Sequence, residues 1–467
     1  MHRPPRAALF GVPALALALA ACGGGSGSRS ASSAAAPPDT TPSSPEARSQ
    51  PAAATPAWPT YHRDLARTGN DSKAPRVARL RRAWRVSVDG DVYAEPLIAR
   101  GRVIVATEND SLYAFSAGSG HQAWHVHLGS PVNGSSLPCG NIDPSGITST
   151  PAIDTKRGVV YTVAFLAPGR HELAAIDLAT GRIRWRRGID PPADPLVHQQ
   201  RAALALANGR VYVPYGGLFG DCGNYHGWVV SVPASGPSGG QVNFEVPTHR
   251  EGAIWAPSGP AVDGRGRLFV STGNGDSTSR FDFGNTVFRL SPSLRRQSYF
   301  APPNAADLNG SDTDLGSVGP TLLPGGRAFA IGKEGVAYLL NAANLGGIGH
   351  PLASRQLCSG AFGGLAYSGG KVYVPCVDGV VAVRVGSRRL SVAWRGPGFK
   401  AGPPIVAGGI VWTVDLDGGE LVGLSTGSGR VAFRAGIGSP PQFSTPSESG
   451  GRIYVSGGSS LVAFTSS

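Results

Sequence analysis

Three carboxylates fall within one short stretch of the sequence, at Asp307, Asp312 and Asp314. Closely spaced carboxylate oxygens are the ligands that calcium prefers in proteins. The stretch lacks the glutamate that completes an EF-hand loop, so its spacing does not favour an independent calcium site. What these side chains can do therefore depends on the elements that position them.

Two other patterns match chemical motifs only in part. His121, His125 and His127 could suggest a metal site, but the alternation of the surrounding residues places them on or near an outer strand. Residues 423–427 read Gly-Leu-Ser-Thr-Gly, which spells the motif of a hydrolase nucleophile. That motif needs a strand–turn–helix setting, whereas here it falls in a glycine turn. We expect neither metal binding nor nucleophilic catalysis from these residues.

Residues 1–21 show the features of an export signal in the usual order. Two arginines precede an apolar stretch, residues 7–18, that is too short to span a bilayer as a stable helix. Residues 19–22, Leu-Ala-Ala-Cys, then resemble the lipobox of bacterial lipoproteins. The resemblance implies cleavage before Cys22 and lipidation of this cysteine. The alternative is an ordinary secretory signal followed by an incidental cysteine.

The segment that follows the signal differs sharply in composition from the rest of the chain. Residues 22–56 consist almost entirely of Gly, Ser, Ala, Pro, Thr and Arg, and bury too little apolar surface to fold. We predict a disordered tether here and a folded part over residues 57–467. Because no second apolar stretch is long enough to cross a membrane, we expect the folded part to be extracytoplasmic and held to a bacterial membrane by lipid alone.

Four cysteines remain besides Cys22, and an even number in an exported chain suggests two disulfides. Four cysteines allow three pairings, of which we favour Cys139–Cys222 and Cys358–Cys376. The sequence holds no C-x-x-C pair of the kind that binds zinc and no C-x-x-C-H motif for covalent haem. The cysteines therefore indicate a structural role.

The composition favours a chain dominated by β-structure. The 467 residues include 67 Gly without a G-X-Y period, which excludes collagen, and the hydrophobic content of 41% excludes wholesale disorder. The formal net charge is +12, but basic residues run together only in short pairs such as Arg81-Arg82 and Arg388-Arg389. Scattered arginines are typical of a solvated surface, so we predict no nucleic-acid partner.

A degenerate repeat organises the chain from about residue 94 onwards. Each unit has a short first strand, a turn, a strand of the type Arg-Val-Tyr-Val, and a third strand rich in Val, Leu and Ala. A glycine turn and an aromatic residue follow. A single sheet of this kind cannot cover both of its faces, so neighbouring units must stack, and a closed ring satisfies all of them. The eight recognisable units predict an all-β, eight-bladed β-propeller of four-stranded antiparallel sheets.

The last unit is incomplete, because it ends after its third strand at Phe464. A strand-like stretch before the first unit, residues 80–86, carries Trp84 as its aromatic residue. We predict that this stretch supplies the fourth strand of the last blade and so closes the ring. Trp84 should then lie close to Phe464.

The units resemble the repeats of the quinoprotein alcohol dehydrogenase-like, or PQQ-binding-like, β-propeller family. Residues 176–185, Ile-Asp-Leu-Ala-Thr-Gly-Arg-Ile-Arg-Trp, fit that family's A-x-D-x-x-T-G-x-x-x-W pattern. The segment from Trp58 to Gly69 also looks like the start of the family's members. The resemblance covers about residues 58–467 and implies the fold. It says much less about activity, because the family includes both dehydrogenases and non-catalytic assembly or binding proteins.

The resemblance also implies a site in the central channel, where catalytic members hold a quinone, a calcium ion and a base. Trp255 matches the ring on which the quinone stacks, Asn274 matches a calcium ligand, and Lys333 matches a cation that faces the quinone. Asp312 or Asp314 stands roughly where the catalytic base would be. In such a site calcium polarises the quinone carbonyl and the carboxylate takes the hydroxyl proton of the substrate.

The chain departs from the catalytic pattern in three respects. It has no adjacent pair of cysteines, no haem motif, and no evident calcium-binding glutamate in the second unit other than Glu172. We therefore favour a non-catalytic binding or scaffold protein of the cell envelope. Its partner would be an envelope protein or a small ligand in the channel, no cofactor is certain, and we expect a monomer.

Two alternatives stay open. The first is a dehydrogenase dependent on PQQ and Ca²⁺ that oxidises an alcohol or a polyol. The second is an envelope assembly factor that resembles outer-membrane assembly propellers, which requires an outer membrane that the sequence does not reveal. Uptake of added quinone and calcium separates the first alternative from a binding or scaffold protein.

Overall fold

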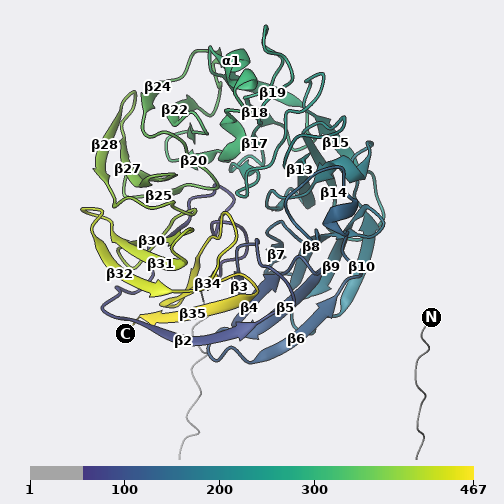
Figure 1. The fold of residues 1–467 in the computed structure, drawn as a ribbon, viewed down its shortest axis with the longest axis vertical. Coiled ribbons are helices and arrows are strands. Elements are labelled where there is room, and N and C mark those ends of the chain that lie inside the picture. Colours follow the sequence, from purple (N-terminus) through teal and green to yellow (C-terminus); the bar gives the residue numbers. More distant parts are fainter. Residues whose placement is uncertain (1–55, 467) are drawn as a thin grey trace, which may run out of the picture. The chain divides into compact units, whose positions relative to one another are not determined.

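The computed structural model describes residues 56–466, which form eight four-stranded antiparallel sheets arranged in a ring (Figure 1). The first strands of neighbouring sheets contact one another, so they line the central axis, and the fourth strands lie at the rim. The predicted all-β, eight-bladed propeller is confirmed.

The first four blades follow the chain in order. Blade 1 comprises β3 (Leu97–Ala99), β4 (Arg102–Ala106), β5 (Ser111–Ser116) and β6 (Gln122–His127). Blade 2 comprises β7 (Ala152–Asp154), β8 (Val159–Leu166), β9 (Arg170–Asp177) and β10 (Ile183–Gly188). Blade 3 comprises β12 (Ala205–Ala207), β13 (Arg210–Gly217), β14 (Trp228–Pro233) and β15 (Val242–Glu245). Blade 4 comprises β16 (Ala261–Val262), β17 (Leu268–Ser271), β18 (Val287–Leu290) and β19 (Arg296–Ala301).

The remaining blades bring the chain back to its start. Blade 5 comprises β20 (Thr321–Leu323), β21 (Arg327–Ala330), β22 (Val336–Asn341) and β24 (Ala353–Gln356). Blade 6 comprises β25 (Ala366–Ser368), β26 (Lys371–Cys376), β27 (Gly379–Val385) and β28 (Leu390–Arg395). Blade 7 comprises β29 (Ile405–Ala407), β30 (Ile410–Asp415), β31 (Glu420–Ser425) and β32 (Val431–Gly436). Blade 8 comprises β33 (Ser447–Ser449), β34 (Arg452–Ser456), β35 (Ser460–Ser466) and β2 (Leu80–Ser87).

Short elements complete the described part of the chain. They are the edge strands β1 (Asn70–Asp71), β11 (His198–Gln199) and β23 (Gly347–Ile348), the helix α1 (Ala305–Gly310), and the 3-10 turns Gly134–Ser136, Pro195–Val197 and Leu315–Ser317.

The aromatic residue of the repeat packs on the glycine turn of the next blade. Gly181 has φ 73°, and a Cβ atom there would lie 2.8 Å from the ring of Trp124 in blade 1. Nε1 of Trp124 also donates to the carbonyl of Leu178, at 3.0 Å. Glycine is therefore needed both for the positive φ and for the space that the tryptophan fills. Two other pairs repeat the contact, Trp84 on Gly120 and Trp394 on Gly429.

The ring closes as predicted. Strand β2 pairs antiparallel with β35, with Arg82 opposite Phe464 and Trp84 opposite Ala463 (Figure 1). The ring of Trp84 lies 5.8 Å from that of Tyr454 in the same blade. The described ends of the propeller are thus joined by a ladder of backbone hydrogen bonds, and blade 8 has four strands like the other blades.

Residues 58–71 lie across the inner strands and close one end of the channel; we call this segment the plug. Its backbone bonds to the first strands of several blades, including Ile98 of blade 1 and Val406 of blade 7. Arg67 is fully buried and donates four hydrogen bonds to carbonyl and hydroxyl oxygens at 2.8–3.1 Å. Glu95 holds the plug from the propeller side, accepting from Nε1 of Trp58 and the amide of His62 at 2.8 Å each.

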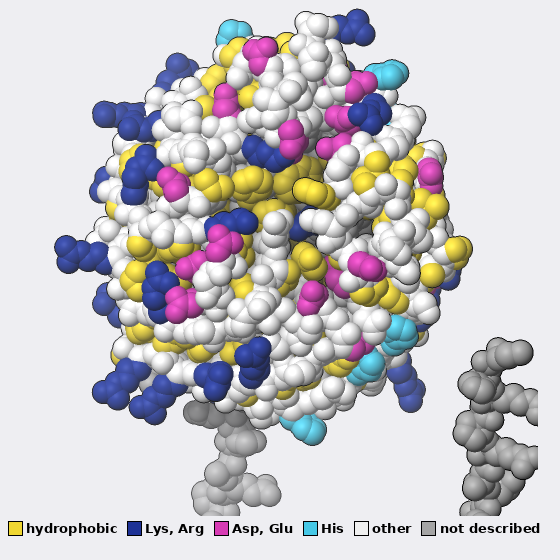
Figure 2. All heavy atoms as spheres, viewed as in Figure 1, with side chains coloured by type: hydrophobic (Ala, Val, Ile, Leu, Met, Phe, Trp, Pro, Cys, Tyr) yellow, Lys and Arg dark blue, Asp and Glu magenta, His cyan; other side chains and the backbone are white. Residues whose placement is uncertain are grey.

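The two ends of the ring are built from different connections. At the plug end lie the turns that join first to second and third to fourth strands within a blade. At the other end, which we call the mouth end, lie the turns between second and third strands and all loops from one blade to the next. Figure 2 shows the mouth end, hollowed at its centre and lined there by hydrophobic side chains.

Both favoured disulfides are present, Cys139–Cys222 and Cys358–Cys376. Each joins an inter-blade loop to a neighbouring turn or strand at the mouth end. Over residues 56–466 no helix is long and apolar enough to cross a membrane. The predicted signal, Cys22 and the tether up to residue 55 lie outside the described residues.

Candidate functional site

Loops at the mouth of blades 3, 4 and 5 bring the predicted site residues together. The loop after β15 carries Trp255, the turn after β17 carries Asn274, and the turn after β21 carries Lys333. The loop from α1 to β20 contributes Asp312 and Asp314. Residues from three blades thus meet at the channel mouth, because every loop between blades and every turn between second and third strands ends there.

Lys333 is the centre of this cluster. Its ammonium Nζ lies 2.6 Å from Oδ2 of Asp314 and 2.8 Å from Oδ1 of Asp312, and it also donates to the carbonyl of Asp312 at 3.1 Å. Lysine has three donors, so these contacts use its full capacity. The ammonium therefore occupies the position between the two carboxylates.

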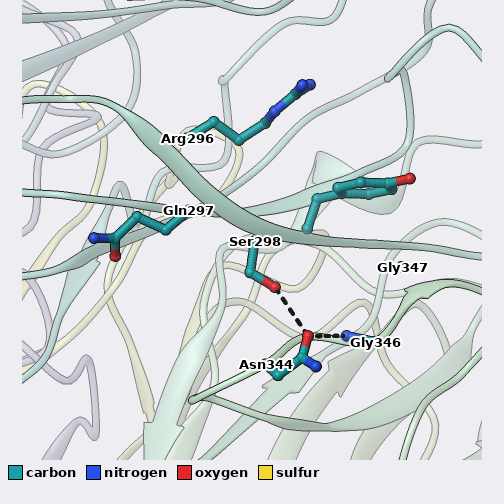
Figure 3. Close-up of a pocket in the computed structure, with 7 residues that line it drawn as sticks. Arg296, Gln297, Ser298, Asn344, Gly346 and Gly347 are labelled. Atoms are coloured by element: carbon teal, nitrogen blue, oxygen red, sulfur yellow. Dashed lines mark hydrogen bonds between the residues drawn. The ribbon is translucent and has the colours of Figure 1, made fainter.

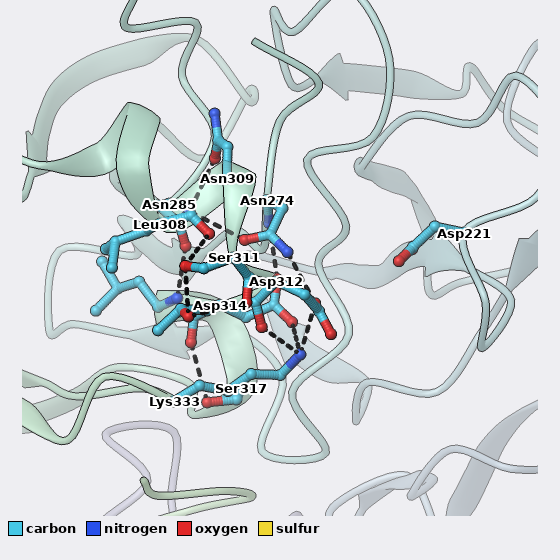
Figure 4. A network of polar contacts seen from close by, with 12 residues as sticks. Asp221, Asn274, Asn285, Leu308, Asn309, Ser311, Asp312, Asp314, Ser317 and Lys333 are labelled. Atoms are coloured by element: carbon cyan, nitrogen blue, oxygen red, sulfur yellow. Dashed lines mark hydrogen bonds and ion pairs between the residues drawn. The ribbon is translucent and has the colours of Figure 1, made fainter. Parts of the chain in front are cut away.

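Asn274 joins the same two carboxylates from the opposite side (Figure 4). Its backbone amide donates to Oδ1 of Asp314 at 2.7 Å, and its side-chain Nδ2 donates to Oδ1 of Asp312 at 2.9 Å. Its Oδ1 accepts from Nδ2 of Asn285, at 3.1 Å. Asn285 in turn accepts from the amide of Leu315 at 2.6 Å, so the network fixes the loop that carries both aspartates.

Burial sets the electrostatics of the cluster. The side chain of Asp314 is 9% exposed, and burial raises its pKa although the Lys333 ammonium opposes this effect. Burial would lower the pKa of Lys333, but the two carboxylates outweigh it and raise that pKa. A Cβ atom at Gly273 would lie 2.4 Å from Oδ1 of Asp314, so only glycine lets the buried carboxylate approach this turn. The pair is consequently a tight internal ion pair.

An aromatic surface lines the mouth beside this ion pair. The ring of Trp255 lies 5.9 Å from Nζ of Lys333 and 6.0 Å from the ring of Phe443. Phe362 stacks on the other side of Phe443, again at 6.0 Å. The three rings come from the loops that lead into blades 4, 8 and 6. Together they form an apolar surface next to fixed charges, which is the usual make-up of a ligand pocket.

Arg201 is a half-buried charged group at the mouth that lies against aromatic rings. Its guanidinium carbon lies 4.8 Å from the ring centre of Phe443 and 5.6 Å from that of Tyr93. Among residues 56–466 it forms no hydrogen bond and no ion pair. Oε1 of nearby Glu108 is also buried without a hydrogen-bond partner, and burial raises the pKa of this carboxyl to about 7. The guanidinium therefore remains available to an anionic group.

Other candidates from the sequence lie elsewhere. Asp307 is exposed on α1 and stays outside the cluster. Glu172 on β9 is held by Arg186 at 3.1 Å and Arg170 at 3.2 Å, so its oxygens serve two arginines. His125 and His127 lie on the rim strand β6 with His121 just before it, and Ser425 ends the strand β31, as their sequence contexts suggested.

The residues present do not fit a calcium–quinone pair. Calcium takes six to eight oxygen ligands. Both carboxylate oxygens of Asp314, the side-chain oxygen of Asn274 and Oδ1 of Asp312 are engaged with internal donors, and a lysine ammonium stands between the carboxylates. Lys333 also faces the ring of Trp255, on which a quinone would have to stack. We therefore derive no reaction step through either group.

Hollows outside the mouth carry no such combination. A hollow of about 440 Å³ lies between blades 4 and 5 at the plug end, where Ser298 and the amide of Gly346 both donate to Asn344 (Figure 3). It contains an arginine, Arg296, but no carboxylate and no histidine. Its polar lining indicates a surface recess with no catalytic group in place.

The first blades of the chain are similar in sequence to a known family. Residues 81–214, from the closing strand into blade 3, match the sequence model of the PQQ_2 family, described as outer membrane protein assembly factor BamB. The curated outer membrane protein assembly factor BamB of Yersinia pestis is 26% identical over 168 residues. That match covers 28% of this chain and 42% of the relative, so the chain matches less than half of the relative's length.

Solved structures extend the likeness to most of the chain. Quinohemoprotein alcohol dehydrogenase ADHIIG from Pseudomonas putida HK5 superimposes with a TM-score of 0.69 at 15% identity, covering 88% of this chain and 80% of that one. BamB from Moraxella catarrhalis gives 0.57 at 17% identity, covering 83% and 98%. The described part of the chain thus has the β-propeller fold of these structures, and residues 81–214 match the PQQ_2 family model. At these identities the solved structures show the propeller's fold and leave its activity to be argued from the site.

Sequence reasoning missed part of the mouth. Arg201, Phe362 and Phe443 lie in inter-blade loops, outside the repeat pattern of the sequence. No family motif marks them in the sequence. All three residues lie a few positions before the first strand of a blade. Residues at this position of the repeat lie at the channel mouth, and this was the available signal in the sequence.

Proposed function

We propose that this propeller is a non-catalytic binding protein of the cell envelope, held to a bacterial membrane through Cys22. Its mouth end would take the partner, because the plug fills the other end of the channel. The lipobox-like sequence at residues 19–22 and the tether composition support the location. The fold supports a rigid scaffold, since loops on a closed ring present side chains in fixed positions.

One observation carries the non-catalytic part of the proposal, namely the ammonium of Lys333 between Asp312 and Asp314. A carboxylate that is to accept a proton from a substrate must be free to bind it. Here Asp314 is buried and saturated by Lys333 and the amide of Asn274. The cluster therefore acts as a brace that fixes the mouth loops.

We assign the recognition itself to Arg201 and its neighbouring rings. A guanidinium without a polar partner can pair with a carboxylate in a bidentate manner, and the ring of Phe443 can stack on an attached planar group. The partner that fits is a small molecule or a protein segment that carries an acidic group next to an aromatic one. Benzoate is the simplest probe with this chemistry.

The binding test uses this probe. Titration of the full chain with benzoate should change the tryptophan fluorescence saturably, because Trp255 lies beside Phe443. Arg201→Gln should weaken binding about tenfold or more through loss of the charged pair. Arg280→Gln, at an exposed arginine of the same end, is the matched control and should leave it unchanged. Equal binding by the two variants would refute the assignment.

A second candidate function is assembly of envelope proteins in an outer membrane. It is favoured by the match of residues 81–214 to the BamB family and by the relative from Yersinia pestis. The match to the family model is confined to the closing strand and blades 1 to 3. It therefore supports a similar blade structure in that part of the chain. An assembly role predicts a stable complex with outer-membrane proteins after cross-linking in intact cells.

The alternative of a quinoprotein dehydrogenase has a direct test. Purified protein is mixed with the quinone PQQ and Ca²⁺, and then examined for bound-cofactor absorbance and dye-linked oxidation of alcohols. We expect neither signal. Tight stoichiometric uptake that is abolished by Asn274→Ala would overturn the non-catalytic proposal.

The anchor is tested separately. Cys22→Ser should release the protein from the membrane fraction into the soluble fraction, because the predicted lipid attachment is lost. Retention of the Cys22→Ser protein at the membrane in high salt would count against lipidation. High salt is needed in this test because it removes electrostatic attachment.

A further inference from the structure

Acidic and basic side chains are distributed unevenly between the two ends of the propeller. Figure 2 shows the mouth end, where Asp and Glu side chains are spread around the central hollow. The turns of the plug end carry arginines instead. Exposed examples without an ion pair among the described residues occur in blades 4, 6 and 7: Arg265, Arg295, Arg384, Arg388, Arg389 and Arg430.

Three acidic residues at the blade turns of the plug end form ion pairs with arginines of the same blade. Asp177 pairs with Arg184 at 2.6 Å, and Asp263 pairs with Arg267 at 2.6 Å. Asp154 pairs in the same way with Arg157, at 3.3 Å. These pairs leave the remaining arginines without local compensation. The plug end therefore has a positive field that the mouth end lacks.

The basic end also has recesses of a size that admits a small anionic group. A hollow of about 520 Å³ in blade 6 is lined by Lys371, Arg384 and Arg389 together with a glycine turn. The hollow in Figure 3 lies at the same end and includes Arg296. Cationic side chains around an open recess suit a phosphate-bearing headgroup, which can approach from outside.

The chain joins the propeller at this same end. Pro56 is the first described residue, and its carbonyl accepts a hydrogen bond from the hydroxyl of Ser449 at 2.6 Å, where β33 meets its turn. The residues before Pro56 include Cys22, the predicted point of lipid attachment. The basic surface and the start of the folded part thus share one end of the molecule.

We infer that the plug end is a docking face for an anionic phospholipid bilayer. Each Lys or Arg close to an anionic membrane contributes about 1 kcal/mol, and the attraction acts within a Debye length of the surface. Arginines spread over several blades would lay the ring flat on the bilayer. The mouth end, with Arg201 and its aromatic surface, then faces away from the membrane and toward partners.

The test separates this contact from any lipid anchor. The full chain with Cys22→Ser is mixed with vesicles of phosphatidylglycerol and phosphatidylcholine, or of phosphatidylcholine alone, and bound protein is measured by flotation. We expect binding only to the anionic vesicles, and loss of binding as salt is raised. The triple variant Arg265→Glu, Arg389→Glu and Arg430→Glu should bind about 100-fold more weakly.

The matched control reverses a charge at the other end. Arg280→Glu lies at the mouth, is exposed, and has no ion pair in the described structure, so it should leave vesicle binding unchanged. All variants share residues 1–55, so binding by that segment would be common to them. Equal vesicle binding by the triple variant and the Arg280→Glu variant would overturn the inference, as would binding of the protein to soluble polyphosphate but not to vesicles.

Discussion

The two ends of this propeller are made by the same eight sheets yet differ in almost every physical respect. At the plug end the connections are tight hairpins, such as the turn that joins β20 to β21, and the channel is filled by residues 58–71. At the mouth end the loops are longer, such as the one from α1 to β20, and carry disulfides and a polar network. The plug end is therefore held by the contacts of one segment with many blades, and the mouth end by side-chain contacts between neighbouring loops.

The difference teaches where this fold can vary. Substitutions at the plug end strike backbone contacts shared by many blades, so they act on the stability of the whole ring. Substitutions at the mouth act on loops that a closed scaffold already holds in place, so they can alter binding at lower cost. The contrast gives four predictions that differ in size.

The largest effect is expected for Arg67→Ala in the plug. The variant loses four hydrogen bonds and leaves buried oxygens unpaired, among them the carbonyls of Leu204 and Pro260. We expect a loss of about 5 kcal/mol or more, enough to unfold many domains. Thermal unfolding followed by circular dichroism, or the absence of soluble protein, measures this.

Its control is Arg250→Ala at the mouth. Arg250 also makes several contacts, to the carbonyls of Asp221 and Gly223 and to the carboxylate of Glu251, but it is partly exposed. Solvent can replace these bonds, so we expect a cost of about 1 kcal/mol at most. Comparable destabilisation by the two variants would erase the proposed contrast between the ends.

The next effect concerns Lys333→Met. Without the ammonium, the buried carboxylate of Asp314 loses its ion pair, which should cost about 4 kcal/mol at neutral pH. The carboxylates are then open to a cation, so millimolar Ca²⁺ should raise the melting temperature of the variant and leave that of the parent protein unchanged.

Lys400→Met supplies the comparison for this experiment. Lys400 stands at the same end, 3.8 Å from exposed Asp417, so its loss should change neither stability nor the response to calcium appreciably. If Ca²⁺ stabilises the parent protein as much as the Lys333→Met variant, the lysine does not fill a cation position and the non-catalytic proposal loses its main support.

Much of the ring was predictable from the sequence, and the reason is local. The second and third strands of each blade are buried on both faces, as in β8, which reads Val-Val-Tyr-Thr-Val-Ala-Phe-Leu. Such runs, separated by glycine turns, mark each blade independently. The incomplete last unit and the extra strand around Trp84 then determined the closure. The even number of cysteines predicted two disulfides, and the pairing that we favoured among the three possible ones is the one that forms.

The site was less accessible to such reasoning. The resemblance named Trp255, Asn274, Asp312, Asp314 and Lys333, and the structure brings them together, but their partners depend on three-dimensional detail. Whether Lys333 lies between the carboxylates or beside them is decided by loop geometry that no repeat encodes. The second role of Gly181, making room for Trp124 of the previous blade, was hidden for the same reason, since the contact links two units.

A smaller effect is expected at that contact. Gly181→Ala forces a Cβ atom against Trp124 and strains a residue with φ 73°, so we expect a cost of about 3 kcal/mol. Gly209→Ala is the matched control, because Gly209 has φ 70° but open space around it, and should cost about 1 kcal/mol. Chemical denaturation measures the free energy of unfolding of both variants. The difference between the two costs is the cost of the contact with Trp124, because both variants carry the cost of the positive φ. Equal costs would show that the tryptophan moves aside freely.

The smallest effect depends on pH and returns to the mouth end. Burial raises the pKa of Glu108 to about 7, above its ordinary value of 4.5, so the folded protein binds a proton that the unfolded chain has released between these values. The free energy of unfolding therefore falls as pH rises through this window, and the full penalty is present above it.

Glu108→Gln removes the penalty and should raise stability by about 2 kcal/mol at pH 8, with little change at pH 4. Glu245→Gln, at an exposed carboxylate near the same end, is the matched control and should change the stability little. If Glu108→Gln were neutral at both pH values, the carboxyl would be hydrated in solution and the mouth would be wetter than its burial indicates.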